Sequence, residues 1–388
     1  MMNYATDIRA AWLFPSLRKG NYWQPIFRDF SQRFETIVYA GLWSGFTPGL
    51  EDTFAVEVVG NTQFGQDYSA RVANASLKIV LPLWKFRPQI IFTSGFSIWT
   101  ILALGLKPVA GWRVAILYDG SSPSIDFRNS WARLLLRRLL ARMADGFCAN
   151  SGAAKDYLID VLHAPPAKVF GSTYLVPDVT ALVPTHQIAA PAVTGAGTDA
   201  QQSVTFLFVG ELIPRKGLRQ LLQACALLDR SSQHHYRLLV VGDGSERAEL
   251  AQLATAENLD DVVTWIGWVP YEQLGTYFQS ADALIFPTLE DVWGMVVLEA
   301  MAFGQPVLCS KWAGAAELIV PGENGELFDP HHPAALAALM TRVLQQPQLL
   351  ATMGANARRM TAQYTPAVAV DNFQMVVDRV LASPPALA

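Results

Sequence analysis

Three acidic residues stand in a stretch of sequence that otherwise favours burial. The stretch runs from Thr288 to Ser310 and carries Glu290, Asp291 and Glu299 among apolar residues. An unpaired buried carboxylate costs on the order of 3 kcal/mol or more, so Glu299, with apolar neighbours on both sides, needs a polar partner. That partner is either a structural cation or a ligand with vicinal hydroxyls, such as a ribose.

A strand and a helix meet at these acids, and their junction could bind an anion. The run ADALIFPT predicts a strand, and WGMVVLEAMAFG predicts a helix whose first amides, at Gly294, Met295 and Val296, have no intrahelical acceptor. An anion there gains hydrogen bonds and a favourable helix dipole. Asp291, in the preceding loop, either caps this helix or reaches the hydroxyls of a sugar, and Trp293 and Gly294 shape the turn.

A second loop offers two cations. The run VTFLFVG predicts a strand that ends at Gly210, and Arg215 and Lys216 follow just before a helix that starts after Gly217. Two cations beside backbone amides suit a diphosphate. A solvated charge pair on a surface turn accounts for them equally well.

A third loop, in VVGDGSERAEL, carries two glycines. Gly242 and Gly244 follow a predicted strand, but Arg247 stands where a dinucleotide fingerprint has its third glycine. We therefore expect a tight turn near a ligand, and a nicotinamide-dependent oxidoreductase is disfavoured.

The loops need a scaffold that brings strand ends together, and the chain supplies one. Short apolar runs alternate with helical patterns: FETIVYA, QIIFTSG, RVAILYD, GFCANSG, VTFLFVG, YRLLVVGDG, VVTWIGWV, ADALIFPT and QPVLCSKWAG. Uninterrupted apolar strands between helices are typical of a parallel sheet covered on both faces, so an α/β, doubly wound fold is expected. Ligands of such sheets bind at the carboxyl ends of the strands.

Two domains are expected from a length of 388 residues. Residues 186–202 are rich in Ala, Gly, Thr and Pro and predict a linker. The N-terminal, acceptor-side domain then covers residues 1–185, and the C-terminal domain covers 203–365. Residues 366–388 begin with a predicted helix that could cross back to the N-terminal domain.

Five runs in sequence order carry a resemblance to a known family: FVGELIPRKGLRQLLQA, VVGDGSERAEL, IGWVPYEQLGTYFQSADALIFPT, DVWGMVVLEAMAFGQPVL and AGAAELIVPGENGELF. They resemble the retaining glycosyltransferases of family 4 (group 1 type), which have the GT-B fold. The resemblance implies two Rossmann-like domains that face a cleft, with a nucleotide sugar bound by the second.

The resemblance also implies roles for site residues. The family's pair of acids, two Glu separated by seven residues, falls on Asp291 and Glu299 and leaves Glu290 out. The resemblance implies that Glu299 binds the ribose and that Lys216 binds the diphosphate. It implies that Asp291 is a catalytic residue that contacts the donor sugar and phosphate. The other residues expected to bind the donor lie in the same loop and in adjoining loops: Gly210, Gly242, Trp293, Gly294 and Met295.

Two departures from the family pattern affect the expected site. Glu211 stands where many members have an Arg on the diphosphate, so either Arg215 supplies that charge or Lys216 and backbone amides hold the phosphate. The first domain's counterpart of a strand ending in His-Asp ends in Tyr118 and Asp119. Asp119 is therefore a candidate for an acceptor-binding or catalytic role, with a loop cap as the alternative.

A glycine-containing loop of the first domain lies where the family contacts the diphosphate. Its candidates are Lys19, Gly20 and Asn21. No Asp-x-Asp pair lies in a suitable loop, and the adjacent pairs His234-His235 and His331-His332 are poorly spaced for one metal. We expect no metal and no cofactor, with a nucleoside diphosphate sugar as substrate.

Charge and cysteine usage bear on the compartment and partners. Residues 1–186 carry 18 Lys and Arg against 13 acids, whereas residues 187–388 carry 11 against 20. The run WARLLLRRLLARMA, residues 131–144, predicts an amphipathic helix that fits an anionic membrane surface or, equally, core packing with Arg borders. Arginines flank the apolar arc expected on this helix, which consists of Leu135, Leu136, Leu139, Leu140 and Met143. Three distant cysteines and no secretory signal predict a cytoplasmic protein, peripheral at the inner face of the membrane if that helix binds lipid. No nucleic-acid module is recognisable.

The expected function is therefore transfer of a sugar from a nucleoside diphosphate to a glycan or lipid-linked acceptor in polysaccharide or envelope biosynthesis. The alternatives are a nucleotide-sugar epimerase on the same fold and a nucleotide-sugar-binding protein without catalysis. Glu211, Asp291 and the missing histidine motivate the second alternative.

Overall fold

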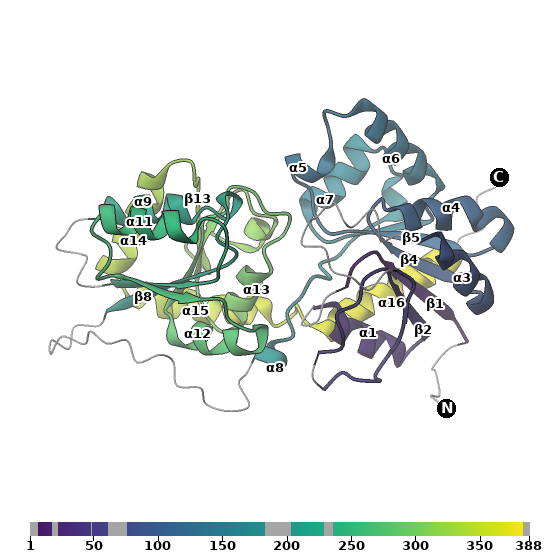
Figure 1. Ribbon diagram of the computed structural model, residues 1–388, viewed down its shortest axis with the longest axis horizontal. Coiled ribbons are helices and arrows are strands. Elements are labelled where there is room, and N and C mark those ends of the chain that lie inside the picture. The colour runs from purple at the N-terminus through teal and green to yellow at the C-terminus, as the bar shows by residue number, and fades with distance from the viewer. Residues whose placement is uncertain are drawn as a thin grey trace. The chain divides into compact units, whose positions relative to one another are not determined.

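The computed structural model describes residues 7–17, 22–47, 49–60, 76–182, 203–228 and 236–382. Residue contacts divide the chain into two units, Met1–Val176 with Tyr364–Ala388, and Pro177–Gln363. The division falls after Val176, whereas the sequence composition suggests about residue 185. The last helix, α16 (Pro366–Ala382), belongs to the first unit (Figure 1).

The first unit is built on a parallel seven-stranded sheet in the order β3-β2-β1-β4-β5-β6-β7. A parallel sheet must be covered on both faces, and successive residues of β1 point to opposite ones. Ala11 and Leu13 join one core cluster, while the ring of Trp12 lies 5.0 Å from that of Phe373 on α16. The strands are β1 (Arg9–Phe14), β2 (Glu35–Ala40), β3 (Ala55–Val58), β4 (Ile90–Ser94), β5 (Arg113–Tyr118), β6 (Gly146–Ala149) and β7 (Val169–Gly171).

Helices cover both faces of this sheet. One core cluster takes its residues from η1, α3, α4, α6, α7 and η2, and the other face is packed by α1 and α16, which contact each other. The helical segments are α1 (Trp23–Ser31), η1 (Leu77–Ile79), α3 (Val80–Phe86), α4 (Ile98–Ala110), α5 (Pro123–Asp126), α6 (Trp131–Met143), α7 (Gly152–Asp156), η2 (Tyr157–Val161) and η3 (Pro166–Lys168).

The second unit has a parallel six-stranded sheet in the order β10-β9-β8-β11-β12-β13. This is the doubly wound order 3-2-1-4-5-6 that is typical of dinucleotide-binding domains. Its strands are β8 (Val204–Val209), β9 (Tyr236–Val241), β10 (Val263–Gly267), β11 (Ala283–Phe286), β12 (Val307–Ser310) and β13 (Gly325–Phe328).

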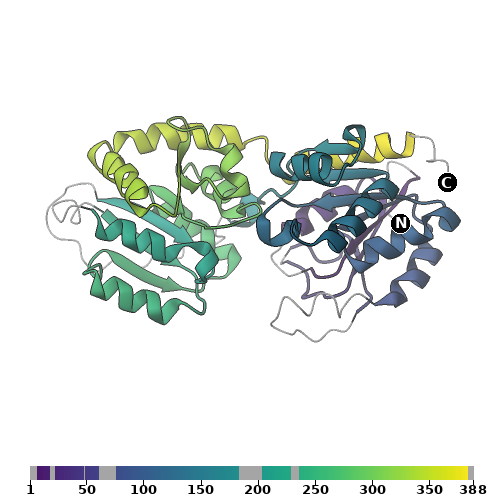
Figure 2. The ribbon, with the colours of Figure 1, turned by 90° about the horizontal axis from the view of Figure 1, so that it is seen from above.

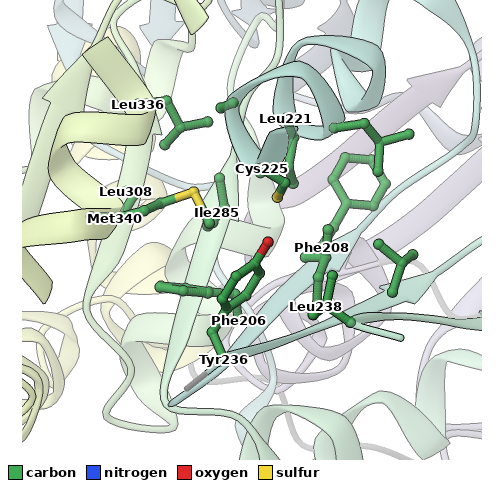
Figure 3. Close-up of a cluster of buried hydrophobic side chains, with 14 of the residues drawn as sticks. Phe206, Phe208, Leu221, Cys225, Tyr236, Leu238, Ile285, Leu308, Leu336 and Met340 are labelled. Atoms are coloured by element: carbon green, nitrogen blue, oxygen red, sulfur yellow. The ribbon is translucent and has the colours of Figure 1, made fainter. Parts of the chain in front are cut away.

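Helices also lie on both faces of the second sheet (Figures 1 and 2). Figure 3 shows a hydrophobic core of this unit, where side chains of β8, β9, β11 and β12 meet those of α9 and α14. The helical segments are α8 (Val179–Leu182), η4 (Pro214–Lys216), α9 (Leu218–Ala226), α11 (Arg247–Ala256), η5 (Tyr271–Gln273), α12 (Leu274–Ser280), α13 (Met295–Ala302), η6 (Gly314–Leu318), α14 (Pro333–Gln345) and α15 (Gln348–Thr361).

The fold class predicted from sequence is confirmed, since each unit is a doubly wound α/β structure. All nine apolar runs form strands, and residues 89–106 form β4, a turn and most of α4. The pattern does not predict β1, β3, β7 or β13. Three of these are short edge strands, and β1 contains two alanines, which have low strand propensity. Within the described ranges, no helix combines the length and apolar composition needed to cross a membrane.

Candidate functional site

The loops after β8 and β11 meet at the point where the strand order of the second sheet reverses. Backbone bonds tie them together, because the Leu289 amide donates to the Arg215 carbonyl over 2.8 Å. The Thr288 hydroxyl contacts the same carbonyl and that of Glu290, each at 3.0 Å. Ligands of doubly wound sheets bind at this switch point, so the two loops form the expected binding edge.

Asp291 and Lys216 form an ion pair across these loops. The Lys216 Nζ lies 2.6 Å from Asp291 Oδ2, and the Arg215 Nη1 lies 3.4 Å from the same oxygen. Asp291 is only 9% exposed, whereas the Arg215 side chain is 44% exposed. The structure therefore brings Asp291 together with the two cations, Arg215 and Lys216, that the sequence places in another loop.

The second carboxylate oxygen of Asp291 does not cap helix α13. Oδ1 accepts a bond of 3.3 Å from the amide of Trp293, which precedes the helix. The carboxylate therefore stabilises the turn before the helix and leaves the first helix amides available to a ligand. The alternative in which Asp291 caps helix α13 is thereby excluded.

Lys216 is positioned to bind a further anion. An ammonium group has three donors, of which one is directed at Asp291. The Nζ also lies 5.7 Å from the centre of the Phe286 ring, at the end of β11. The negative charge of Asp291 also affects the buried Cys309, because it adds to the effect of burial in raising the pKa of the Cys309 thiol.

The N-terminus of α13 faces the same edge and has no side-chain cap. Gly294 stands at the N-cap with φ of 102°, and a Cβ there would lie 2.6 Å from the Phe286 ring. Only glycine adopts this conformation in this space without strain. The amides of Met295 and Val296 then have no intrahelical acceptor and can donate to a ligand.

Glu299 is buried in the second turn of α13. It is 4% exposed, and its Oε1 accepts a bond of 3.0 Å from the hydroxyl of Tyr271, in η5 after β10. Burial raises the pKa of Glu299 to about 7, and the tyrosine bond opposes part of that effect. No described cation pairs with Glu299, so the structural ion pair weighed from sequence is wrong and a neutral donor takes its place.

Tyr271 is a site residue that the sequence analysis missed. It lies in the loop after β10, so the rule that ligands bind at carboxyl ends of strands was the available signal. Spacing alone does not pair it with Glu299, which is 28 residues later in the chain.

The glycines after β9 are required by close backbone packing. A Cβ on Gly242 would lie 1.9 Å from the Gly210 carbonyl oxygen, and one on Gly244 would lie 2.5 Å from that of Leu212. These glycines therefore let the loop after β9 pack on the loop after β8. Arg247, at the start of α11, stacks its guanidinium 4.1 Å from the centre of the Trp265 ring.

Asp119 lies at the carboxyl end of β5 in the first unit. It accepts a bond of 2.8 Å from the hydroxyl of Tyr174. Burial raises the pKa of Asp119, and this bond partly opposes the rise. The neighbouring Tyr118 donates to Asp126 over 2.9 Å, so its hydroxyl serves an internal network. Lys19, Gly20 and Asn21 lie outside the described residues.

Metal-binding clusters of three or more His, Cys, Asp or Glu do not occur among the residues that the structure describes. The three cysteines, Cys148, Cys225 and Cys309, are all buried and free. The polar groups gathered at the second sheet are therefore two cations, two carboxylates, helix amides and a tyrosine.

A family comparison agrees with this arrangement. Residues 197–360 match the model for glycosyl transferases group 1, a range that contains every one of these groups. These residues belong to that family.

Relatives of the group 1 glycosyltransferase region include two proteins named D-inositol 3-phosphate glycosyltransferase. The one from Thermobispora bispora is 31% identical over 242 residues, covering 60% of this chain and 55% of its own length. The one from Pseudarthrobacter chlorophenolicus is 32% identical over 181 residues, covering 45% and 43%. The chain thus spans about half the length of these relatives.

Solved structures resemble the whole chain at lower sequence identity. The Anabaena protein HepE, solved in complex with UDP, has a TM-score of 0.71 at 20% identity and covers 96% of this chain and 99% of its own. Sucrose-phosphate synthase of Thermosynechococcus elongatus has a TM-score of 0.74 at 19% identity, covering 97% and 100%. This structural similarity confirms the expected GT-B fold class for the chain that contains the group 1 region.

Proposed function

We propose that the protein transfers a sugar, with retention of configuration, from a nucleoside diphosphate to an acceptor hydroxyl. This makes it a hexosyltransferase-type enzyme of family 4. The observation that carries the proposal is the convergence of Lys216, the uncapped N-terminus of α13 and the buried Glu299 at one edge of the second sheet. A diphosphate and a ribose together need those groups: cations and amides for the first, and a carboxylate for the second.

Lys216 and the amides of α13 bind the diphosphate in this proposal. Both act on negative charge that grows when the bond to the sugar breaks, so they stabilise the transition state more than the bound donor. Arg215 replaces the missing family arginine, because its half-exposed guanidinium lies beside Asp291 while Glu211 is exposed. Glu299 accepts hydrogen bonds from the two ribose hydroxyls.

The transfer step needs no cofactor. The bond between the anomeric carbon and the phosphate oxygen breaks, and its electron pair leaves with the diphosphate. The acceptor oxygen bonds to the same carbon from the same face, and its proton passes to a phosphate oxygen of the leaving group. Asp291 accepts hydrogen bonds from the donor sugar while it holds Lys216, and so orients both partners of the breaking bond.

Asp119 is the proposed acceptor-side carboxylate. Its location after a strand of the first unit and its single tyrosine partner support a role in orienting an acceptor hydroxyl. The bond from Tyr174 equally supports the loop-structural alternative. Gly20 and Asn21 stay proposed contacts of the diphosphate on resemblance alone.

The donor to test first is UDP-glucose. HepE has been solved with UDP-glucose, and its fold covers 95% of this chain. A glycan or lipid-linked acceptor in polysaccharide or envelope biosynthesis is proposed because another structure of the same fold is a lipopolysaccharide outer core galactosyltransferase. We propose a cytoplasmic location, which is where nucleotide sugars are made available to such reactions.

Helix α6 supports a peripheral contact with an anionic membrane. Trp131, Leu135, Leu136 and Leu139 are 44–78% exposed, and the helix contains no acidic residue. The expected leucine arc is corrected at one end, since Leu140 is buried and Met143 is half-buried. Two of its arginines point inward, because Arg137 and Arg138 donate to backbone carbonyls.

Vesicle flotation tests this contact. Arg133→Gln with Arg142→Gln should lower binding to vesicles containing anionic lipid, because each surface cation contributes about 1 kcal/mol. Lys155→Gln with Arg359→Gln, two exposed residues outside α6, is a control of equal charge change. Equal flotation of the α6 variant and the native protein would remove the membrane proposal.

Product analysis tests the transfer itself. Native protein with UDP-glucose and a panel of glycan and lipid-linked acceptors should release UDP and yield a glycoside with the donor's anomeric configuration. An epimerase would change the sugar of the donor without an acceptor. A binding protein without catalysis would retain the donor and release no UDP in any combination.

A further inference from the structure

A pocket lies in the first unit at the amino ends of β4 and β5. Parallel strands place their carboxyl ends at the opposite edge of the sheet, so this pocket is separate from Asp119 and from the edge where substrates are expected. Its volume is about 460 Å³, within the 300–1,000 Å³ range of small-molecule sites.

The pocket is lined chiefly by apolar and aromatic side chains. Leu83 and Trp112 are 1% and 2% exposed and form buried walls, and Leu381 of α16 also lines the pocket. The indole N–H of Trp112 is already bonded to the Ala103 carbonyl, at 2.8 Å, so its ring offers the pocket apolar surface. A hydrocarbon group fits such walls.

The rim of the pocket is exposed and apolar. Trp84, on α3, is 44% exposed, and Val109, at the end of α4, is 77% exposed. Leu77 and Leu81 continue the exposed apolar surface along η1 and α3. The pocket mouth therefore offers exposed apolar surface to a long apolar ligand.

Two cations line the pocket, and one of them is available. Arg113 is bonded to Asp145 over 3.2 Å and is 12% exposed. Arg87 is exposed and has no carboxylate partner among the described residues, and the described lining contains no acidic residue. The electrostatics of the pocket mouth therefore favour an anionic group.

The backbone of Arg87 is the second indication. It ends α3 in the left-handed region, with φ of 51° and ψ of 59°, and its amide donates to the Leu83 carbonyl. Glycine is the usual residue at such a helix end, and a residue with a side chain is strained there. Strain of this kind is found at ligand sites, and at Arg87 it coincides with the pocket mouth.

We infer that this pocket binds a single-chain anionic amphiphile, with the alkyl chain between Leu83, Trp112 and Leu381 and the head group on Arg87. A fatty acid and an alkyl phosphate share this chemistry. Calorimetric titration with decanoate and with decyl phosphate, each below its micelle concentration, distinguishes the two. Inorganic phosphate and decanol provide the head alone and the chain alone.

The native protein should bind one equivalent of one or both anionic amphiphiles and neither control compound comparably. Arg87→Gly should weaken binding about tenfold or more, because it removes a charge-assisted contact. It should fold normally, with an unchanged or higher Tm, since glycine accepts the backbone conformation. Val109→Glu should weaken binding further than Val109→Gln, because only the former adds a negative charge at the rim.

Several outcomes would overturn the inference. These are no saturable binding to the native protein, equal affinity in Arg87→Gly, or equal effects of Glu and Gln at position 109. Loss of binding in Leu139→Gln would assign the amphiphile to α6 instead. Nucleotide-sugar binding should be unaltered in Arg87→Gly, which separates this test from that of the transfer function.

Discussion

At the scale of single residues, the buried carboxylate of Glu299 is the feature most directly tied to function. Its apolar flanks allowed the need for a polar partner to be predicted from sequence. The partner itself could not be predicted, because Tyr271 lies 28 residues away and is brought near only by the sheet. In the structure one tyrosine hydroxyl serves a group that can accept several hydrogen bonds, which leaves acceptor capacity for a ligand.

Stability should depend on pH through Glu299. Its pKa is raised from 4.5 to about 7 in the folded protein. The protonated form therefore favours the fold, and this contribution is complete below pH 4.5 and lost as pH rises through about 7. Glu299→Gln cannot ionise, so relative to the native protein it should gain on the order of 2–3 kcal/mol between pH 5 and pH 8. Urea unfolding of both proteins at the two pH values measures the gain, and a constant difference would contradict the assignment.

Asp291 and Glu290 form a matched pair of adjacent acids for a second test. Asp291→Asn should reduce transfer about a hundredfold, because it removes the charge that holds Lys216 and a donor contact. Glu290→Gln should change transfer by about twofold at most, since the loop uses the backbone carbonyl of Glu290. Steady-state rates measure both, with Tm as a check on folding. Equal losses in the two variants would mean that the acids do not differ in role.

At the scale of elements, strands with uninterrupted apolar sequence were predictable and close backbone approaches were not. Gly294 was expected to shape a turn, but its neighbour, the ring of Phe286 on β11, is defined only by the fold. Gly242 and Gly210, which were predicted to lie near a ligand, also pack loop against loop. Backbone packing leaves no periodic trace in sequence, which is why these close approaches could not be predicted.

Two glycines with positive φ allow the cost of backbone strain to be measured separately from the cost of a steric clash. Gly294→Ala should destabilise the protein by about 2 kcal/mol or more, because the new Cβ adds a clash with Phe286 to a strained φ of 102°. Gly322→Ala, with φ of 81° and open space around its Cβ, should cost about 1 kcal/mol. Urea midpoints give both values. A Gly294→Ala cost no larger than that of Gly322→Ala would show that the helix start is not held by this contact.

At the scale of the whole molecule, the chain folds as two doubly wound units, and its last helix returns to the first. The return is anchored by aromatic packing, since Phe373 of α16 lies within 5.5 Å of Trp12, Phe92 and Tyr174 as measured between ring centres. The helix itself was predictable from its Pro366 start and its periodicity. Its location was left open, because an amphipathic pattern shows that a helix packs without showing on what.

The division of charge between the halves of the chain is consistent with two different tasks. The second unit, which holds the group 1 glycosyltransferase region, places Arg215 and Lys216 at the loop after β8, where an anionic ligand is proposed. The first unit contributes the exposed arginines of α6 and the pocket mouth at Arg87. Donor recognition and contacts with amphiphilic partners are thereby assigned to separate units.

Thermal shift with a panel of nucleoside diphosphate sugars tests the central claim most directly, because a ligand that binds the folded state raises apparent stability by mass action. At least one nucleotide sugar should raise the Tm of the native protein, and Glu299→Ala should remove most of that rise while Glu290→Gln retains it. No rise with any nucleotide sugar, or an equal rise in Glu299→Ala, would contradict a donor site at this edge of the second sheet.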